Sequence, residues 1–220
     1  MGQNGLDVTD WDMRIYRVFS IGRFKDLLLT KRNGLVHPSK WDDPFENFFL
    51  KCKARGSTGE LVSLEPISSS WYGQCWTMNR DSDAMWRIYS PKKDGVRVAT
   101  TIRKLLSAIY DHSDKFCALK YFIGVVKYME RNEIESFLST TSVMDLGFGG
   151  QPHNFARTLS IKRREFEHEK EVRLLIHDAE KNMGIGGVVS VDFDHAMVLD
   201  EVTLDPRLEA PAFESADKNL

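Results

Sequence analysis

Glu169, Glu171 and Arg173 alternate with other residues late in the chain, and their types and spacing could support catalysis. In an extended strand every second side chain lies on one face, so neighbours on that face are roughly 6.5–7 Å apart. At that separation two carboxylates influence each other's ionisation, and a nearby guanidinium keeps one of them charged. The opposite face would pack on the core through Val172, Leu174 and Ile176. The row is therefore either the rigid base of a site or a solvated sheet face with alternating charges.

The composition is that of an ordinary globular domain, with 42% apolar and 28% charged residues. The 30 basic and 32 acidic side chains nearly cancel, so no global basic field favours nucleic acid or an anionic membrane. Three cysteines without a C-x-x-C pair and six histidines without H-x-x-x-H spacing favour neither a disulfide framework nor a metal site. The polar first residues are unlike a secretory leader, and no apolar run approaches the roughly 20 residues of a membrane span. We therefore expect a cytoplasmic protein with no membrane segment.

A single domain over residues 1–220 is expected, with its core at about 14–206 and a flexible polar tail from about 209. The pattern predicts an α+β fold with four or five helices and a mixed or antiparallel sheet of about seven strands. The predicted strands are 14–20, 71–77, 96–100, 118–129, 166–176, 188–193 and 201–204. Residues 155–166 are predicted to be a helix whose basic cluster, 162–164, forms a solvated face, and residues 139–152 a loop.

Several motifs occur in an order that is similar to one protein family. They are Tyr16-Arg17, Trp41-Asp42-Asp43-Pro44-Phe45-Glu46, Met85-Trp86 with Tyr89, a Val-x-Tyr ending at Tyr128, Glu169-Lys-Glu171-Val-Arg173 and Leu204-Asp-Pro206. Together they resemble the bacterial domain-of-unknown-function family 2971 from about residue 16 to 206. Asp42 departs from the asparagine usual in that family.

More distantly, three of these features resemble the ADP-ribosyltransferases, which consume NAD. Arg17 on a first strand, Ser139-Thr-Thr-Ser142 and the later Glu169-x-Glu171 follow the order of their arginine, serine–threonine–serine and E-x-E pattern, with one residue inserted in the middle element. The resemblance implies an NAD substrate, a protein or nucleic-acid acceptor, and a role such as a bacterial toxin or anti-phage effector.

The resemblance also implies a role for each candidate residue. Glu171 would bind the ribose and stabilise its oxocarbenium character, and Glu169 would orient or deprotonate the acceptor. Arg17 would pair with a phosphate, and Arg173 would keep one glutamate ionised. The cofactor-binding set is completed by Trp86 or Tyr89, which could stack on a base, and by Ser139.

Two alternatives belong to other functional classes. In a metal-dependent nuclease, magnesium would be held by Asp43, Glu46, Glu169 and Glu171. The E-x-E segment lacks the lysine of a D…E-x-K pattern, which argues against this alternative. In a non-catalytic interaction module, Asp43 would cap a helix, Trp86 would fill the core, and Glu171 and Arg173 would form an ion pair on a sheet face.

Overall fold

The computed structural model of the 220-residue chain describes residues 2–41, 43, 53–55, 60–63, 65–140 and 152–208. Its contacts group the chain into two compact units. The first unit consists of Met1–Thr9, Gly34–Cys75 and Tyr110–Ser190, and the second of Asp10–Asn33, Trp76–Ile109 and Val191–Leu220. The single domain stays a prediction, and the predicted tail from 209 lies outside the described residues.

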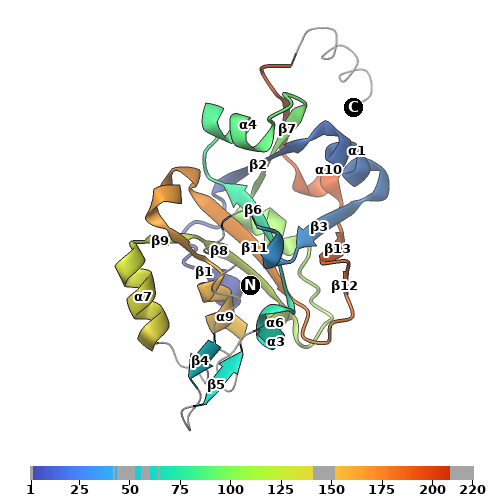
Figure 1. Ribbon diagram of the computed structural model, residues 1–220. Coiled ribbons are helices and arrows are strands. Elements are labelled where there is room, and N and C mark those ends of the chain that lie inside the picture. Colours follow the sequence, from blue (N-terminus) through green and yellow to red (C-terminus); the bar gives the residue numbers. More distant parts are fainter. Residues whose placement is uncertain are drawn as a thin grey trace. The chain divides into compact units, whose positions relative to one another are not determined.

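The first unit is built around strand β11 (Glu171–His177), which lies between β8 (Tyr121–Val125) and β6 (Trp71–Thr77) (Figure 1). β8 is antiparallel to β11 and carries the short parallel strand β1 (Gly5–Leu6) on its other edge. The remaining strands are β3 (Arg32–Val36) beside β6, the hairpin β12 (Gly184–Ile185) and β13 (Val188–Asp192), the parallel pair β9 (Lys127–Met129) and β10 (Ile161–Arg163), and the antiparallel pair β4 (Lys53–Arg55) and β5 (Leu61–Ser63). β3, β6 and β13 each continue along the chain into the second unit.

Short helices connect these strands. The α-helices of the first unit are α3 (Glu65–Ser68), α6 (Cys117–Lys120), α7 (Arg131–Thr140) and α9 (Pro152–Thr158). Its 3-10 helices are η1 (Gly2–Asn4), η2 (Pro38–Lys40) and η3 (Arg164–Glu169).

Trp71 is the centre of the first unit's core. Its indole is fully buried, stacks on Phe155 with a ring-centroid distance of 5.4 Å and packs at a tilt against Phe122 at 5.7 Å. The same cluster contains Leu6, Ala156, Leu159 and Leu175. Strand β11 is buried on both of its faces from Glu171 to Ile176, as expected for a central strand with neighbours on each side. The charged residues of this strand are therefore enclosed, and the predicted solvated face is wrong.

The second unit contains an antiparallel group of three strands. β7 (Gly95–Thr101) lies between β2 (Arg14–Ser20) and β14 (Glu201–Leu204). The helices are α1 (Ile21–Thr30), α4 (Asp83–Tyr89), α5 (Ile102–Ser107) and α10 (His195–Val198). The N-termini of α1, α4 and α5 are capped by hydroxyl side chains, those of Ser20, Ser82 and Thr101.

The predicted α+β class is confirmed, and the strands are mostly antiparallel. The described residues form eight α-helices, more than predicted, because several are single turns. None of the helices in the described ranges is long and apolar enough to cross a membrane.

Three predicted elements are wrong. The strand predicted over 118–129 begins instead in helix α6 and is divided into β8 and β9, which pair with different strands. The helix predicted over 155–166 ends at Thr158 and is followed by strand β10. The strand predicted from 166 begins only at Glu171, because η3 precedes it and Lys170 adopts a left-handed conformation with φ 44° that breaks extended pairing. In addition, α7 continues to Thr140, so Ser139 belongs to a helix rather than a loop.

Candidate functional site

Glu171 and Arg173 form a bidentate salt bridge inside the first unit. The Nε atom of Arg173 donates to Oε1 of Glu171 at 2.8 Å, and its Nη2 donates to Oε2 at 2.9 Å. Glu171 is 3% exposed and Arg173 1% exposed. Residues two apart on a strand point to the same side, so the guanidinium fork reaches the carboxylate without leaving the strand.

Lys162 joins Glu169 to this pair. From β10, its Nζ donates to Oε2 of Glu169 at 2.6 Å and to Oε2 of Glu171 at 3.1 Å. All three side chains are buried. The two glutamates therefore meet at one ammonium group, although Glu169 ends helix η3 and only Glu171 lies on the strand.

Arg173 is enclosed by further contacts. Its Nη1 donates to the carbonyl oxygen of Leu159 at 2.6 Å, and its guanidinium lies 4.3 Å from the centre of the Trp41 ring. Gly73 leaves room for that indole, because a Cβ atom at position 73 would come within 2.6 Å of Trp41 Cζ2. Trp41 and Arg173, 132 residues apart in the sequence, thus pack against each other.

The surroundings of Glu171 keep its carboxylate charged. Burial alone would raise its pKa, but the charge and hydrogen bonds of Arg173, together with Lys162 and the Cys75 side chain, lower the pKa from 4.5 to about 2. The backbone N–H of Glu171 donates to the hydroxyl oxygen of Tyr128 at 2.8 Å. Burial raises the pKa of Tyr128 to about 12, so this phenol stays protonated at neutral pH.

The cluster is balanced in charge. Two carboxylates face one ammonium and one guanidinium, which leaves no net negative charge to attract a divalent cation. Across the part of the chain that is described, no group of three or more His, Cys, Asp or Glu side chains could hold a metal ion. Asp43 pairs instead with Arg163, at 3.0 Å from its Nη2. Glu46, the other proposed nuclease ligand, lies outside the described residues.

The remaining predicted site residues lie on other elements. Arg17, on β2 of the second unit, is partly buried, with its guanidinium 5.2 Å from the centre of the Phe19 ring. On α4 of the same unit, Trp86 is 6% exposed and Tyr89 is 43% exposed. Ser139 belongs to α7, and its side chain lies outside the described residues. A common hollow for Arg17 and Glu171 stays a prediction.

Sequence reasoning missed Lys162, Trp41 and Tyr128 as members of the cluster. The prediction that residues 162–164 form a solvated helix face is wrong for Lys162, which is buried on β10. Charge balance was the available signal, because a buried pair of glutamates needs nearby cations and Lys162 lies only seven residues before Glu169. Tyr128 was visible as the end of the Val-x-Tyr motif.

The chain is similar to solved structures of DarT from Thermus sp. 2.9. The structure in complex with ADP-ribosylated ssDNA has a TM-score of 0.40 and 11% identity, covering 94% of this chain and 87% of that chain. The complex with NAD+ has a TM-score of 0.40 and 11% identity, covering 96% and 89%. The complex with carba-NAD+ has a TM-score of 0.38 and 13% identity, covering 95% and 89%.

None of the curated proteins compared with the sequence matches it. The protein-family comparison does find a match, and it covers the segment from α4 to the middle of β11, with the Met85-Trp86, Val-x-Tyr and E-x-E-x-R motifs. Residues 85–174 match the family described as protein of unknown function (DUF2971), which confirms over that segment the resemblance drawn from the motifs.

Proposed function

We propose that the protein is an ADP-ribosyltransferase-like enzyme that cleaves the nicotinamide–ribose bond of NAD and transfers ADP-ribose to a macromolecule. One observation carries the proposal: Glu171 is buried, ionised at neutral pH and fixed in orientation by Arg173 and Lys162. Glu169 is held two residues away by the same ammonium. This is the E-x-E pair of the resemblance, placed on a rigid support.

The charge state of Glu171 suits this reaction. Loss of nicotinamide builds positive oxocarbenium character on the ribose, and an ionised carboxylate stabilises such a transition state. A pKa of about 2 keeps Glu171 anionic at every physiological pH, so it acts as an electrostatic partner and not as a proton donor. No metal ion is needed for this step.

Glu169 takes a different role in the proposal. It ends helix η3 and is not part of the sheet, and its Oε2 accepts a hydrogen bond from Lys162 at 2.6 Å. In the proposal, the carboxylate of Glu169 orients or deprotonates the acceptor nucleophile, as in the E-x-E pair of the resemblance. The acceptor is a protein or nucleic acid, and a toxin or anti-phage effector is the role that fits such a modification.

The residues proposed to bind NAD are Arg17, Tyr89 or Trp86, and Ser139. Arg17 supplies a guanidinium fork for a phosphate of the dinucleotide. Tyr89, which is exposed, is better suited to stack on a base than Trp86, which is buried. Ser139 is carried by helix α7.

The test measures nicotinamide release from NAD by the purified full chain, alone and with candidate protein and nucleic-acid acceptors. The Glu171→Gln variant is expected to lose at least about a hundredfold in NAD turnover, a loss typical of removing an electrostatic catalytic group. The Glu169→Gln variant is expected to keep NAD hydrolysis and lose transfer to the acceptor. The exposed residue Glu167 supplies the matched control, because Glu167→Gln changes a glutamate of the same 3-10 helix outside the cluster.

Circular dichroism and the thermal unfolding midpoint establish that each variant is folded at the assay temperature. Undiminished NAD turnover by folded Glu171→Gln protein would remove the proposal. A wild-type protein that neither binds nor consumes NAD would instead favour the non-catalytic module, in which the same cluster only stabilises the first unit.

A further inference from the structure

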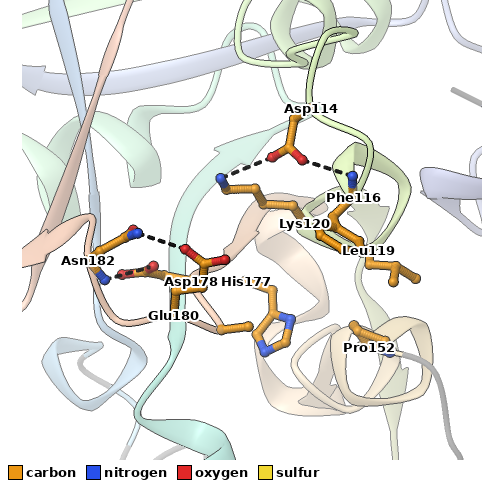
Figure 2. Close-up of a pocket in the computed structure, with 10 residues that line it drawn as sticks. Asp114, Phe116, Leu119, Lys120, Pro152, His177, Asp178, Glu180 and Asn182 are labelled. Atoms are coloured by element: carbon orange, nitrogen blue, oxygen red, sulfur yellow. Dashed lines mark hydrogen bonds and ion pairs between the residues drawn. The ribbon is translucent and has the colours of Figure 1, made fainter.

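A pocket lined by none of the residues of the glutamate cluster lies at the C-terminal end of β11. Its volume is about 340 Å³, within the range of about 300–1,000 Å³ typical of small-molecule sites. It is lined by residues of the α6 region and of the segment after β11, and Figure 2 shows His177 between these two groups. Glu171 begins and His177 ends the same strand, so at about 3.3 Å per residue the two sites are roughly 20 Å apart.

The floor and one wall of the pocket are held in place without a ligand. The His177 ring stacks on the buried indole of Trp71, with 4.7 Å between ring centroids and an interplanar angle of 17°. The carboxylate of Asp178 accepts backbone N–H hydrogen bonds from Asn182 at 3.2 Å, Met183 at 3.0 Å and Gly184 at 3.1 Å. These bonds fix the segment that follows the strand, so binding costs little ordering of this wall.

The opposite side of the pocket exposes apolar surface. Phe116 is 52% exposed and Leu119 is 38% exposed, and both line the pocket. Exposed large apolar side chains at the mouth of a cavity are typical of a ligand-binding site. The Phe116 ring already attracts a cation, because Nζ of Lys115 lies 4.9 Å from its centre.

The charged side chains of the lining favour a positive ligand. Asp114, Asp178 and Glu180 supply three carboxylates against the one ammonium of Lys120. Burial lowers the pKa of His177, which keeps that ring neutral at physiological pH. Asp114 accepts hydrogen bonds from Lys120 Nζ at 3.2 Å and from the backbone N–H of Phe116 at 2.8 Å, and Glu180 accepts one from Asn182 at 2.9 Å. A carboxylate has about four acceptor positions, so both can accept another donor.

We propose that this pocket binds a small organic cation, an ammonium or guanidinium group joined to an apolar body. The apolar body packs between Phe116 and Leu119, and the cationic nitrogen faces the carboxylates of Asp114 and Glu180. The site does not depend on the proposed reaction with NAD, because it uses none of the residues assigned to that reaction.

Three probes of nearly the same shape and different charge test the proposal: 2-phenylethylammonium, 2-phenylethanol and phenylacetate. Each is titrated into the isotopically labelled full chain, and backbone amide chemical shifts are followed by NMR. The ammonium is expected to shift the amides of Leu119 and His177 saturably and to bind about fivefold or more tightly than the alcohol. Phenylacetate is expected to bind least. Equal affinity of the three probes, preference for phenylacetate, or shifts that do not saturate would overturn the proposal.

Two variants separate the charged contact from the apolar one. Glu180→Gln is expected to weaken binding of the ammonium about two- to fivefold and to leave binding of the alcohol unchanged. Phe116→Ser is expected to weaken both. Both positions are exposed, so the fold is retained, and Glu165→Gln, an exposed glutamate on η3, is the matched control. An ammonium affinity that is the same in Glu180→Gln and Glu165→Gln would contradict the role of the carboxylate.

Discussion

Arg173 binds Glu171 from two residues further along the same strand, and both side chains are buried. The guanidinium is held from three directions: by the carboxylate, by the carbonyl oxygen of Leu159 and by the Trp41 ring. Such a buried ion pair gives little net stability compared with apolar residues of the same volume. Removing either partner is nevertheless strongly destabilising, because it leaves the other charge buried without compensation. It therefore serves as a rigid support for a charged carboxylate, whichever function that carboxylate has.

Removing one member of the pair is expected to destabilise the protein strongly. Arg173→Met leaves Glu171 buried with only Lys162 as a cationic partner, and we expect a loss of about 3–5 kcal/mol in the free energy of unfolding, measured by urea denaturation. The exposed Arg87, paired with Asp83 on α4, is the control, and Arg87→Met should cost less than about 1 kcal/mol. Similar losses in both variants would contradict the buried ion pair.

The low pKa of Glu171 predicts how stability depends on pH. Its pKa is about 2 in the folded protein and 4.5 as the ordinary value, so the folded state binds this proton less readily than the unfolded state. The resulting stabilisation, about 3 kcal/mol, is fully present above pH 4.5 and is lost as the pH falls toward 2.

Denaturant titrations of wild type and Glu171→Gln between pH 6 and pH 2 isolate this contribution from that of the other carboxylates. The free energy of unfolding should fall less steeply with acid in the variant, with the difference confined to pH values below about 4.5. Parallel curves would show that Glu171 is not held charged by the fold.

Gly73 offers a test of the packing around Trp41, and Gly22 is the matched control. Gly73→Ala places a methyl group 2.6 Å from Trp41 and 3.0 Å from Leu175, and we expect a loss of about 1–3 kcal/mol in the free energy of unfolding. Gly22→Ala, inside helix α1, meets nothing within 4 Å and should stabilise the protein by up to about 1 kcal/mol. Thermal or urea unfolding of the two variants should therefore move in opposite directions.

The fold class and most strands could be predicted because periodicity and turn residues report directly on local structure. The arrangement around Glu171 could not, because it depends on contacts distant in the chain, such as Trp41 with Arg173. The alternation of glutamates before Glu171 was misleading: a left-handed residue at Lys170 ends the strand pattern, and lysine gives no sequence signal for that conformation. Lys162 was misplaced because the apolar periodicity of 155–159 does not reveal where a helix ends.

The Met85-Trp86 and Leu204-Asp-Pro206 motifs of the second unit predict a structural role for Asp205. Arg207 Nη2 donates to the carbonyl oxygens of Trp86 and Ser90, each at 2.8 Å, and also to Asp205 at 2.7 Å. Asp205 in addition accepts from the hydroxyl of Ser90 at 2.6 Å. The Met85-Trp86 and Leu204-Asp-Pro206 motifs thus meet at the C-terminal end of α4, where a guanidinium also suits the helix dipole.

Asp205→Asn removes the charge that holds Arg207 in this position, while the shape of the side chain is kept. We expect a loss of about 1.5–3 kcal/mol in the free energy of unfolding, because hydrogen bonds between charged groups at a buried carboxylate are replaced by weaker ones. Asp83→Asn, at an exposed carboxylate of the same helix, should cost less than about 1 kcal/mol. If both variants unfold at the same urea concentration, the two motifs do not stabilise α4, and a functional reason for their residues must be sought instead.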